Sequence, residues 1–375
     1  MRKRSAISAL GLMAAALAVG FDRRAAGDAA AQTWPPFVLV AGLLAVGLVA
    51  NSDGLFEWAA GLLARLPGGD TVLYAASMLL VAMVTVFLNL DTSVAFLTPV
   101  LIHVARTRGA GRTRLLYGCV FMSNSASLLL PGSNLTNLLV LSHQHLNGAV
   151  FAARMLPAWI AAVVVTMVVV GLVVRDRDDG ARELRDRGGT RPGWLGSVGA
   201  GLAVLLVVGL DDPAIPVLLL GIVLLGVAFA RGSVRPAEAW ETIDPVSLAA
   251  VFAVAIGLGT LARRWVVPGE LMARSGVLLT VAAAAGAAVL VNNLPAAVLL
   301  STPIPPHPRS LLLGLDLGPN LAMTGSLSAL IWYRAARAVG ERPSPARYTA
   351  IGAVLVPLTL LATLGAEALA GTAGL

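Results

Sequence analysis

The chain has 375 residues, of which 57% are hydrophobic and 13% are charged, and its mean hydropathy is +0.83. Soluble domains have about 45–50% apolar and about 25% charged residues, so the composition excludes an ordinary soluble protein and predicts an all-α polytopic membrane protein. Long continuous apolar runs exclude a transmembrane β-barrel. The net charge of +7 would suggest a nucleic-acid partner in a soluble protein, but the arginines lie in short loops between apolar runs, so no nucleic-acid partner is expected.

Several kinds of chemistry are also excluded. The single cysteine, Cys119, rules out an internal disulfide and a cysteine-cluster metal site. No GxxxxGK[ST] phosphate loop occurs, so the chain carries no ATPase of its own. We therefore predict a protein that is not an enzyme, with no catalytic residues, no cofactor and no metal ligands.

In chain order, residues 1–35 come first. Three cations precede an apolar stretch over 5–21, which is either a retained span or a cleaved signal peptide. The run FDRR at 21–24 is unusual before a cleavage site and favours a retained span. In both cases the N-terminus begins in the cytoplasm, and an external linker leads up to residue 35.

The rest of the chain divides into two halves of matching order. Residues 36–174 contain a span over 36–50, an amphipathic piece over 54–66, a hairpin over 70–105, an interrupted span over 115–141 and a closing span over 155–174. The charged segment 175–193 is interpreted as a cytoplasmic linker, and 194–245 as two connecting spans. Residues 246–375 contain a span over 246–262, a short piece over 263–274, a hairpin over 275–303, an interrupted span over 311–333 and a closing span over 348–369.

The second arm of each hairpin is short. The apolar runs 93–105 and 294–302 cannot cross an apolar core that needs about 20 helical residues, so we predict re-entrant hairpins; two full spans with polar loops are the alternative. Most of the 27 Lys and Arg residues then fall on the cytoplasmic side, and the C-terminus is external. The layout has about nine spans in the cell membrane. Its hairpins enter from opposite sides, which makes the halves an inverted repeat, as in many secondary transporters.

Polar residues at membrane depth form four clusters, two in each half. The tips of the hairpins carry Asn89-Leu90-Asp91-Thr92-Ser93 and Asn292-Asn293. The interrupted spans contain Pro131-Gly132 and Gly318-Pro319, which break a helix and free backbone groups for a ligand. The candidate substrate-binding residues are Asn89, Thr92, Ser93, Asn124, Ser125, Ser133, Asn134, Asn137, Asn292, Asn293, Asn320, Thr324 and Ser326.

Asp91 and Asp316 are the two carboxylates at the centre of this pattern. A charge at the bilayer centre costs about 2.5–3.5 kcal/mol on insertion scales, so each is a functional candidate, and we predict that both exchange protons during transport. The alternative for Asp91 is a structural acid bonded to N–H groups of the hairpin. For the amide and hydroxyl residues, the alternative is hydrogen bonding between helices.

Four stretches resemble the arsenite efflux permease family of the ion-transporter superfamily. They are GLFEWAAGLLAR at 54–65, DTSVAFLTP at 91–99, SNSASLLLPGSNLTNLL at 123–139, and VNNLPAAVL together with DLGPNLAMTGSLSALIW. The resemblance runs from about residue 36 to the end, and it implies the family's fold and its export of trivalent arsenic and antimony. A more distant resemblance to the sodium–dicarboxylate symporters follows from the same architecture and polar tips.

Two positions depart from the family pattern. Asn124 stands where the family has Asp, and Asn320 stands where it has Lys in Gly-Pro-Lys. One negative and one positive charge are both absent, so the net change is zero. We hypothesise that the two residues were exchanged together as a pair, because losing one charge alone would leave the other buried and unpaired.

The sequence therefore predicts a proton-coupled exporter of arsenite, antimonite or a similar small oxyanion or hydroxide, working by alternating access. Arsenite is a neutral trihydroxide at pH 7, and hydroxyls, amides and freed backbone groups are suited to hydrogen-bond it. A proton is favoured over sodium as the coupling ion. Two alternatives stay open: a sodium- or proton-coupled transporter of citrate or dicarboxylates, and a membrane subunit driven by a separate ATPase. The sequence also leaves a homodimer open.

Overall fold

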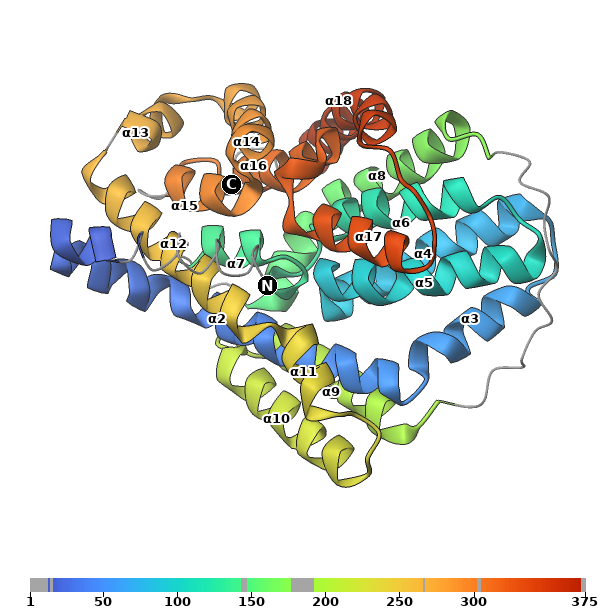
Figure 1. Cartoon of the computed structure of the whole chain (residues 1–375). Coiled ribbons are helices and arrows are strands. Elements are labelled where there is room, and N and C mark those ends of the chain that lie inside the picture. Colours follow the sequence, from blue (N-terminus) through green and yellow to red (C-terminus); the bar gives the residue numbers. More distant parts are fainter. Residues whose placement is uncertain are drawn as a thin grey trace.

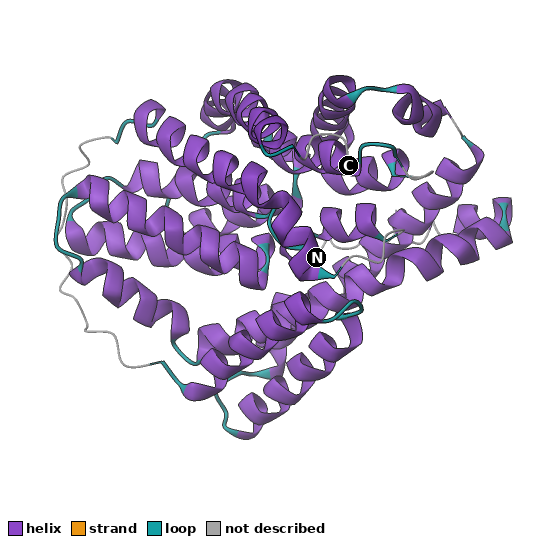
Figure 2. Ribbon diagram, turned by 180° about the vertical axis from the view of Figure 1, so that it is seen from behind, coloured by secondary structure: helices purple, strands orange, loops and turns teal. Residues whose placement is uncertain are grey.

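The computed structural model describes residues 13, 16–142, 147–176, 192–265, 267–301 and 305–371, and every regular element in these ranges is a helix (Figure 2). The first half contains α2 (Arg23–Ser52), α3 (Leu55–Arg65), α4 (Asp70–Leu88), α5 (Leu90–Arg108), α6 (Arg112–Ala126), the 3₁₀ turn η1 (Pro131–Ser133), α7 (Leu135–Leu141) and α8 (Gly148–Val173). The connecting helices are α9 (Trp194–Gly209), α10 (Ala214–Ala230) and α11 (Pro236–Ile243). The second half contains α12 (Pro245–Arg264), α13 (Val267–Arg274), α14 (Val277–Val291), α15 (Asn293–Leu300), α16 (Pro308–Leu317), η2 (Gly318–Leu321), η3 (Met323–Gly325), α17 (Leu327–Ala338) and α18 (Pro345–Leu369). The predicted all-α fold is confirmed.

Helix length and apolarity agree with a polytopic membrane protein. Within the described ranges, five helical segments are long and apolar enough to cross a membrane: 23–52, 70–88, 148–173, 236–264 and 345–369. Three further apolar helices, α9, α10 and α14, are shorter. Five is below the nine spans expected from the apolar runs, because α6 and α16 stop at internal breaks and several other runs form helices of fewer than 18 residues.

The N-terminal part of the fold differs from the expected external linker. The chain is helical from Arg23 onward, so the last part of the supposed linker is the beginning of α2. Its sequence RRAAGDAAAQ is rich in alanine, the best helix former, and the Asp22 side chain caps the helix by accepting from the Ala25 N–H at 3.0 Å. Pro35 and Pro36 lie inside this helix. Most of the charged linker 175–193 lies outside the described residues.

The two hairpins differ in the length of their second arm. In the first, α5 has 19 residues, or about 28 Å at 1.5 Å per residue, because the polar run after Asn89 belongs to the helix rather than to a loop. That length removes the argument that this arm is too short to cross, so re-entrance of the first hairpin stays a prediction. In the second, α15 has 8 residues, which span about 12 Å and cannot cross a core about 30 Å thick.

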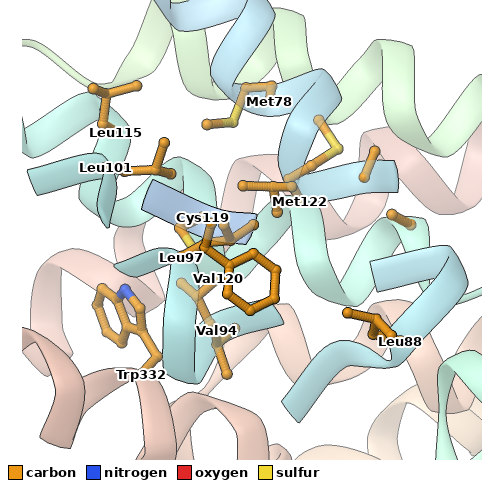
Figure 3. Close-up of a cluster of buried hydrophobic side chains, with 14 of the residues drawn as sticks. Met78, Leu88, Val94, Leu97, Leu101, Leu115, Cys119, Val120, Met122 and Trp332 are labelled. Atoms are coloured by element: carbon orange, nitrogen blue, oxygen red, sulfur yellow. The ribbon is translucent and has the colours of Figure 1, made fainter. Parts of the chain in front are cut away.

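Packing joins the two halves around α2 and around the first hairpin. The long helix α2 contacts α9, α10 and α12 (Figure 1). The arms α4 and α5 pack against α6, and α17 packs across α5. Between these helices lies an apolar cluster that includes Val94, Leu97, Cys119 and Trp332 (Figure 3). Cys119 is fully buried there, with its sulfur 3.6 Å from the Thr98 hydroxyl, so its role in this structure is packing.

The closing helix α18 approaches the second break very closely at Gly352. A Cβ atom at this position would lie 2.0 Å from the carbonyl oxygen of Asn320, a backbone atom that cannot swing aside. Gly365, on the same helix, has no atom of another segment within 4 Å of its would-be Cβ. Glycine at 352 therefore sets the distance between α18 and η2.

We expect Gly352→Ala to destabilise the protein by about 1–3 kcal/mol, the usual cost of overpacking, and to displace the second break. Gly365→Ala is the matched control, and it should raise stability by up to about 1 kcal/mol because alanine is the better helix former. Thermal unfolding of both variants in detergent provides the measurement. Equal thermal unfolding midpoints for the two variants would show that the close approach of α18 to η2 at Gly352 does not affect stability.

Candidate functional site

An asparagine in an unusual backbone conformation begins the second arm of each hairpin. Asn89 has φ 127° and ψ 170°, and Asn292 has φ 78° and ψ 149°. Each side-chain oxygen caps the helix that follows, accepting from the Thr92 N–H at 2.8 Å and from the Leu294 N–H at 3.2 Å. Non-glycine residues with these angles cost about 1–3 kcal/mol and persist only where the surroundings impose them. The two tips thus share one local geometry.

The interrupted spans restart in a matched way. Asn134 precedes α7 with φ −147° and ψ 133°, and Ser326 precedes α17 with φ −143° and ψ 144°. Their side chains accept from the Thr136 N–H at 3.1 Å and from the Ser328 N–H at 3.2 Å. The breaks therefore fall where the sequence predicts them, and each restarted helix begins with a polar cap that satisfies one of its first N–H groups.

Within each half, the hairpin tip is bonded to the interrupted span. The Ser133 hydroxyl donates to the Val86 carbonyl, three residues before Asn89, at 3.0 Å. In the second half, the Asn292 amide donates to the Thr324 carbonyl at 3.0 Å. Each tip and its break therefore form one local unit, although the bonded groups differ between the halves.

Across the halves, the two interrupted spans meet through their polar residues. The Asn134 amide donates to the Asp316 carboxylate at 2.9 Å, and the Ser328 hydroxyl donates to the Asn124 oxygen at 3.3 Å, with Ser326 and Ser328 bonded to each other. Residues 124 and 316 precede the caps 134 and 326 by the same number of positions. The contacts therefore match. In each half, a residue at the start of the restarted helix is bonded to the residue that lies ten positions before the cap in the other half.

Asn124 and Asn320, the two departures from the family pattern, are direct partners. The Asn124 amide donates to the Asn320 oxygen at 2.8 Å, and both side chains are buried. The hypothesis that they were exchanged as a pair thus has the geometry it requires. An Asp and a Lys at these positions would face each other, and two asparagines keep a hydrogen bond there with no charge.

Both closing helices donate a hydrogen bond to a backbone carbonyl beside a break. The Trp159 indole of α8 donates to the Ala126 carbonyl at 3.1 Å. The Tyr348 hydroxyl of α18 donates to the Pro319 carbonyl, also at 3.1 Å. In the first half, the Asn137 amide further donates to the Ser127 and Leu130 carbonyls at 2.8 and 3.2 Å. The Pro319 and Leu130 carbonyls also accept from the Ala322 and Ser133 N–H groups at 3.3 and 3.1 Å, so the carbonyls at the breaks are largely taken up by hydrogen bonds within the protein.

The two predicted acids lie in different surroundings. Asp316 is fully buried; its Oδ1 accepts from Asn134, and its Oδ2 has no hydrogen-bond partner in the described part of the chain. Asp91, in the first turn of α5, is half-buried, and its carboxylate makes no hydrogen bond or ion pair within the same ranges. The role of Asp91 therefore stays a prediction.

The other predicted residues divide into those near the junction and those turned away from it. Ser93 bonds to Ser123 at 3.2 Å, and Ser125 bonds to Thr166 of α8 at 2.7 Å, away from the second half. Thr92 lies against Gly47 of α2, whose would-be Cβ is 2.6 Å from its methyl group. Asn293 is buried at the start of α15, and Thr324 is exposed. Asn137 and Ser133 bond to backbone carbonyls, so these two stabilise the break.

Sequence reasoning missed four residues that build the junction. They are Ser127, Trp159, Ser328 and Tyr348. Ser127 and Ser328 lie inside stretches already singled out for their resemblance to the family, so their polar side chains there were the signal. Trp159 and Tyr348 lie in the closing spans, where a single aromatic residue gives no signal until packing brings it to the break. In the described part of the chain, no three His, Cys, Asp or Glu side chains gather into a metal site.

We expect Asn89→Gly to be at least as stable as the wild type, because glycine adopts the angles of Asn89 without strain and costs only a few tenths of a kcal/mol as a cap. Asn89→Ala keeps the strain and loses the cap, so it should lose about 1 kcal/mol. Thermal unfolding compares the two variants, and Asn292→Gly and Asn292→Ala test the second tip. An alanine variant as stable as the glycine variant would contradict the strain argument.

The asparagine pair is tested by restoring the family's charges. Asn124→Asp alone buries a second carboxylate near Asp316, and we expect a loss of about 3–5 kcal/mol, typical of an unpaired buried charge. Asn320→Lys alone should cost less, since Asp316 lies one turn away. The double variant should recover most of the loss, as measured by thermal unfolding in a double-mutant cycle. A double variant no more stable than Asn124→Asp would show that the two positions are not coupled.

The chain is similar to known proteins over most of its length. Arsenical pump membrane proteins of Yersinia enterocolitica and Escherichia coli are 27% and 25% identical to this chain, each over 90% of it and 86% of their own length. The crystal structure of the Alcanivorax borkumensis YdaH transporter superposes with a TM-score of 0.58 over 92% of this chain and 87% of that one, at 14% identity, a likeness of fold alone.

The relatives and the apolar helices together identify a multi-pass membrane protein that works as a secondary transporter. The model of the family CitMHS, described as citrate transporter, matches residues 1–331. With that match covering most of its length, the chain belongs to the citrate transporter family.

Proposed function

We propose that this chain is a proton-coupled exporter of arsenite or antimonite in the cell membrane, working by alternating access. The observation that carries the proposal is Asp316, a fully buried carboxylate at the junction of the two interrupted spans. One of its oxygens is bonded to Asn134, and the other has no partner in the ranges that the structure describes. A buried acid that keeps a free oxygen can hold a proton on one side of the membrane and release it on the other.

The chemistry of the junction supports a small, neutral, oxygen-rich substrate. The side chains bonded there are amides, hydroxyls and one carboxylate, and none of them is a Lys or Arg. A multiply charged anion would need a cation to offset its desolvation. Arsenite is a neutral trihydroxide at pH 7, so it needs only hydrogen bonds. The arsenical pump membrane proteins that match 90% of this chain support the same substrate.

Coupling to protons rather than sodium is supported by the hydrogen bonds that side chains donate to the carbonyls at the breaks. Sodium in a broken helix is held by unwound carbonyl groups, and here Trp159, Asn137 and Tyr348 donate to such groups. Protonation of Asp316 would turn its free oxygen from an acceptor into a donor and so change what the site can bind. Asp91, half-buried and without a bonded partner among the described residues, is the second exchangeable acid.

A second candidate function follows from the family match. The model that matches residues 1–331 is described as a citrate transporter, which favours a sodium- or proton-coupled carboxylate transporter. Sodium-dependent thermal stabilisation by citrate or succinate, but not by arsenite, would support it over arsenite export.

Arsenite uptake into inverted membrane vesicles tests the proposal. With the lumen made acidic, wild-type vesicles should accumulate arsenite without ATP, and a protonophore should abolish the accumulation. Asp91→Asn combined with Asp316→Asn should abolish it as well, because neither residue could then exchange a proton. Asp70→Asn, an exposed acid in the first turn of α4, is the matched control and should keep wild-type uptake.

Two results would contradict the proposal. If wild-type vesicles take up no arsenite, arsenite is not the substrate. If uptake survives in the Asp91→Asn, Asp316→Asn double variant, transport is not coupled to protons through these two acids.

A further inference from the structure

Two buried polar atoms of the second interrupted span have no partner in the described part of the chain, and their residues are four positions apart. One is Oδ2 of Asp316, at the end of α16, and the other is Nδ2 of Asn320, in η2. Both side chains are 0% exposed. An unmade hydrogen bond on a buried group costs about 1–3 kcal/mol, so such a pair needs an explanation.

The contacts of their remaining atoms show where both side chains point. Oδ1 of Asp316 accepts from Asn134 at 2.9 Å, and Oδ1 of Asn320 accepts from Asn124 at 2.8 Å. Asn134 and Asn124 belong to the same interrupted span, and Ser127 links them, with bonds of 3.3 Å to the Asn134 amide and 2.8 Å to the Asn124 carbonyl. Asp316 and Asn320 therefore both turn toward the first interrupted span, into a single interface.

The two free atoms differ in chemistry. The ionised carboxylate of Asp316 only accepts, and the amide nitrogen of Asn320 only donates. A cation would bind the carboxylate oxygen and leave the amide nitrogen without an acceptor. An anion would accept from the amide and leave the oxygen without a donor. A hydroxyl group satisfies both, because it donates one hydrogen bond and accepts another.

We propose that Asp316 and Asn320 form a clamp for one hydroxyl group of the substrate, with Asp316 accepting from it and Asn320 donating to it. This inference rests on the proposed function and deepens it: the ligand class is a small molecule that carries a hydroxyl at the end that enters the junction. Arsenite, a trihydroxide, carries three such groups. Asn320 is then the residue that selects a hydroxyl over a bare cation.

An exchange of the two residues tests the clamp. In the Asp316→Asn, Asn320→Asp double variant, both existing hydrogen bonds can form again, because position 316 still accepts from Asn134 and position 320 still accepts from Asn124. The free acceptor and the free donor change places, and the total charge is unchanged. Asp316→Asn alone leaves two free donors, and Asn320→Asp alone leaves two free acceptors, so neither can serve both sides of a hydroxyl.

Arsenite binding to the purified full-length protein is measured by calorimetry at pH 7, with thermal unfolding as the check on folding. Each single variant should lose at least about tenfold in affinity, since a site built around a hydroxyl discriminates strongly once one partner is lost. The exchanged double variant should return to within about threefold of the wild type. An exchanged variant that stays folded and binds as weakly as Asp316→Asn would overturn the clamp, as would wild-type affinity in either single variant.

A second pair of ligands separates failure of the clamp from failure of the proposed function. If the wild type does not bind arsenite, the substrate is wrong, and the clamp is tested with citrate against tricarballylate, the same molecule without its hydroxyl. A preference for citrate of at least about tenfold, lost in Asp316→Asn and recovered in the exchanged variant, would support the clamp. Equal affinity for the two compounds, or no binding of any of the three ligands, would overturn it.

Discussion

Backbone groups that leave a helix inside a membrane have no water to bond with, and the rest of this structure depends on how they are satisfied. Each unsatisfied group costs several kcal/mol in hydrocarbon. The chain nevertheless stops two helices after Ala126 and after Leu317. Such breaks are tolerated only where protein surrounds them or a cavity lies beside them, so the elements around them act as a shell of hydrogen-bond partners.

That shell is built in the same way in both halves. Polar caps begin the restarted helices, an aromatic side chain from each closing helix donates to a carbonyl beside a break, and each tip is bonded to its own break. What the shell leaves unsatisfied then becomes informative. In the described residues of the second interrupted span, the buried side-chain atoms without a partner are Oδ2 of Asp316 and Nδ2 of Asn320, and the first break leaves Thr136 Oγ1 and Asn137 Oδ1 in the same condition.

The sequence was sufficient for the parts of the fold that local chemistry dictates. Pro131-Gly132 and Gly318-Pro319 predicted both breaks, and the clusters around Asn89 and Asn292 predicted both tips, because proline, glycine and capping residues act within a few positions of themselves. The length of α5 was misjudged for a related reason: Asp91, Thr92 and Ser93 are residue types that favour both loops and first turns of helices.

Contacts between distant segments could not be read from the sequence in the same way. Asn124 and Asn320 drew attention as departures from a family pattern, yet only the packing of α6 against η2 shows that they touch. Trp159 and Tyr348 gave no signal at all, since an aromatic residue in an apolar span is ordinary until its polar atom is found beside a carbonyl. Local propensity determined where the helices break, and packing determined which side chains meet at the breaks.

The positions of the two acids break the likeness between the halves. Asp91 lies two residues after its tip asparagine, where the second half has Leu294, and Asp316 occupies the position that the first half fills with Asn124. In a transporter whose halves exchange roles, identical halves would make the inward-facing and outward-facing states equal in free energy. Here each half carries one acid, at places that do not correspond. If the proposed proton coupling holds, the two states keep their protons in unlike surroundings, and the chain then has a built-in preference between them even without a gradient.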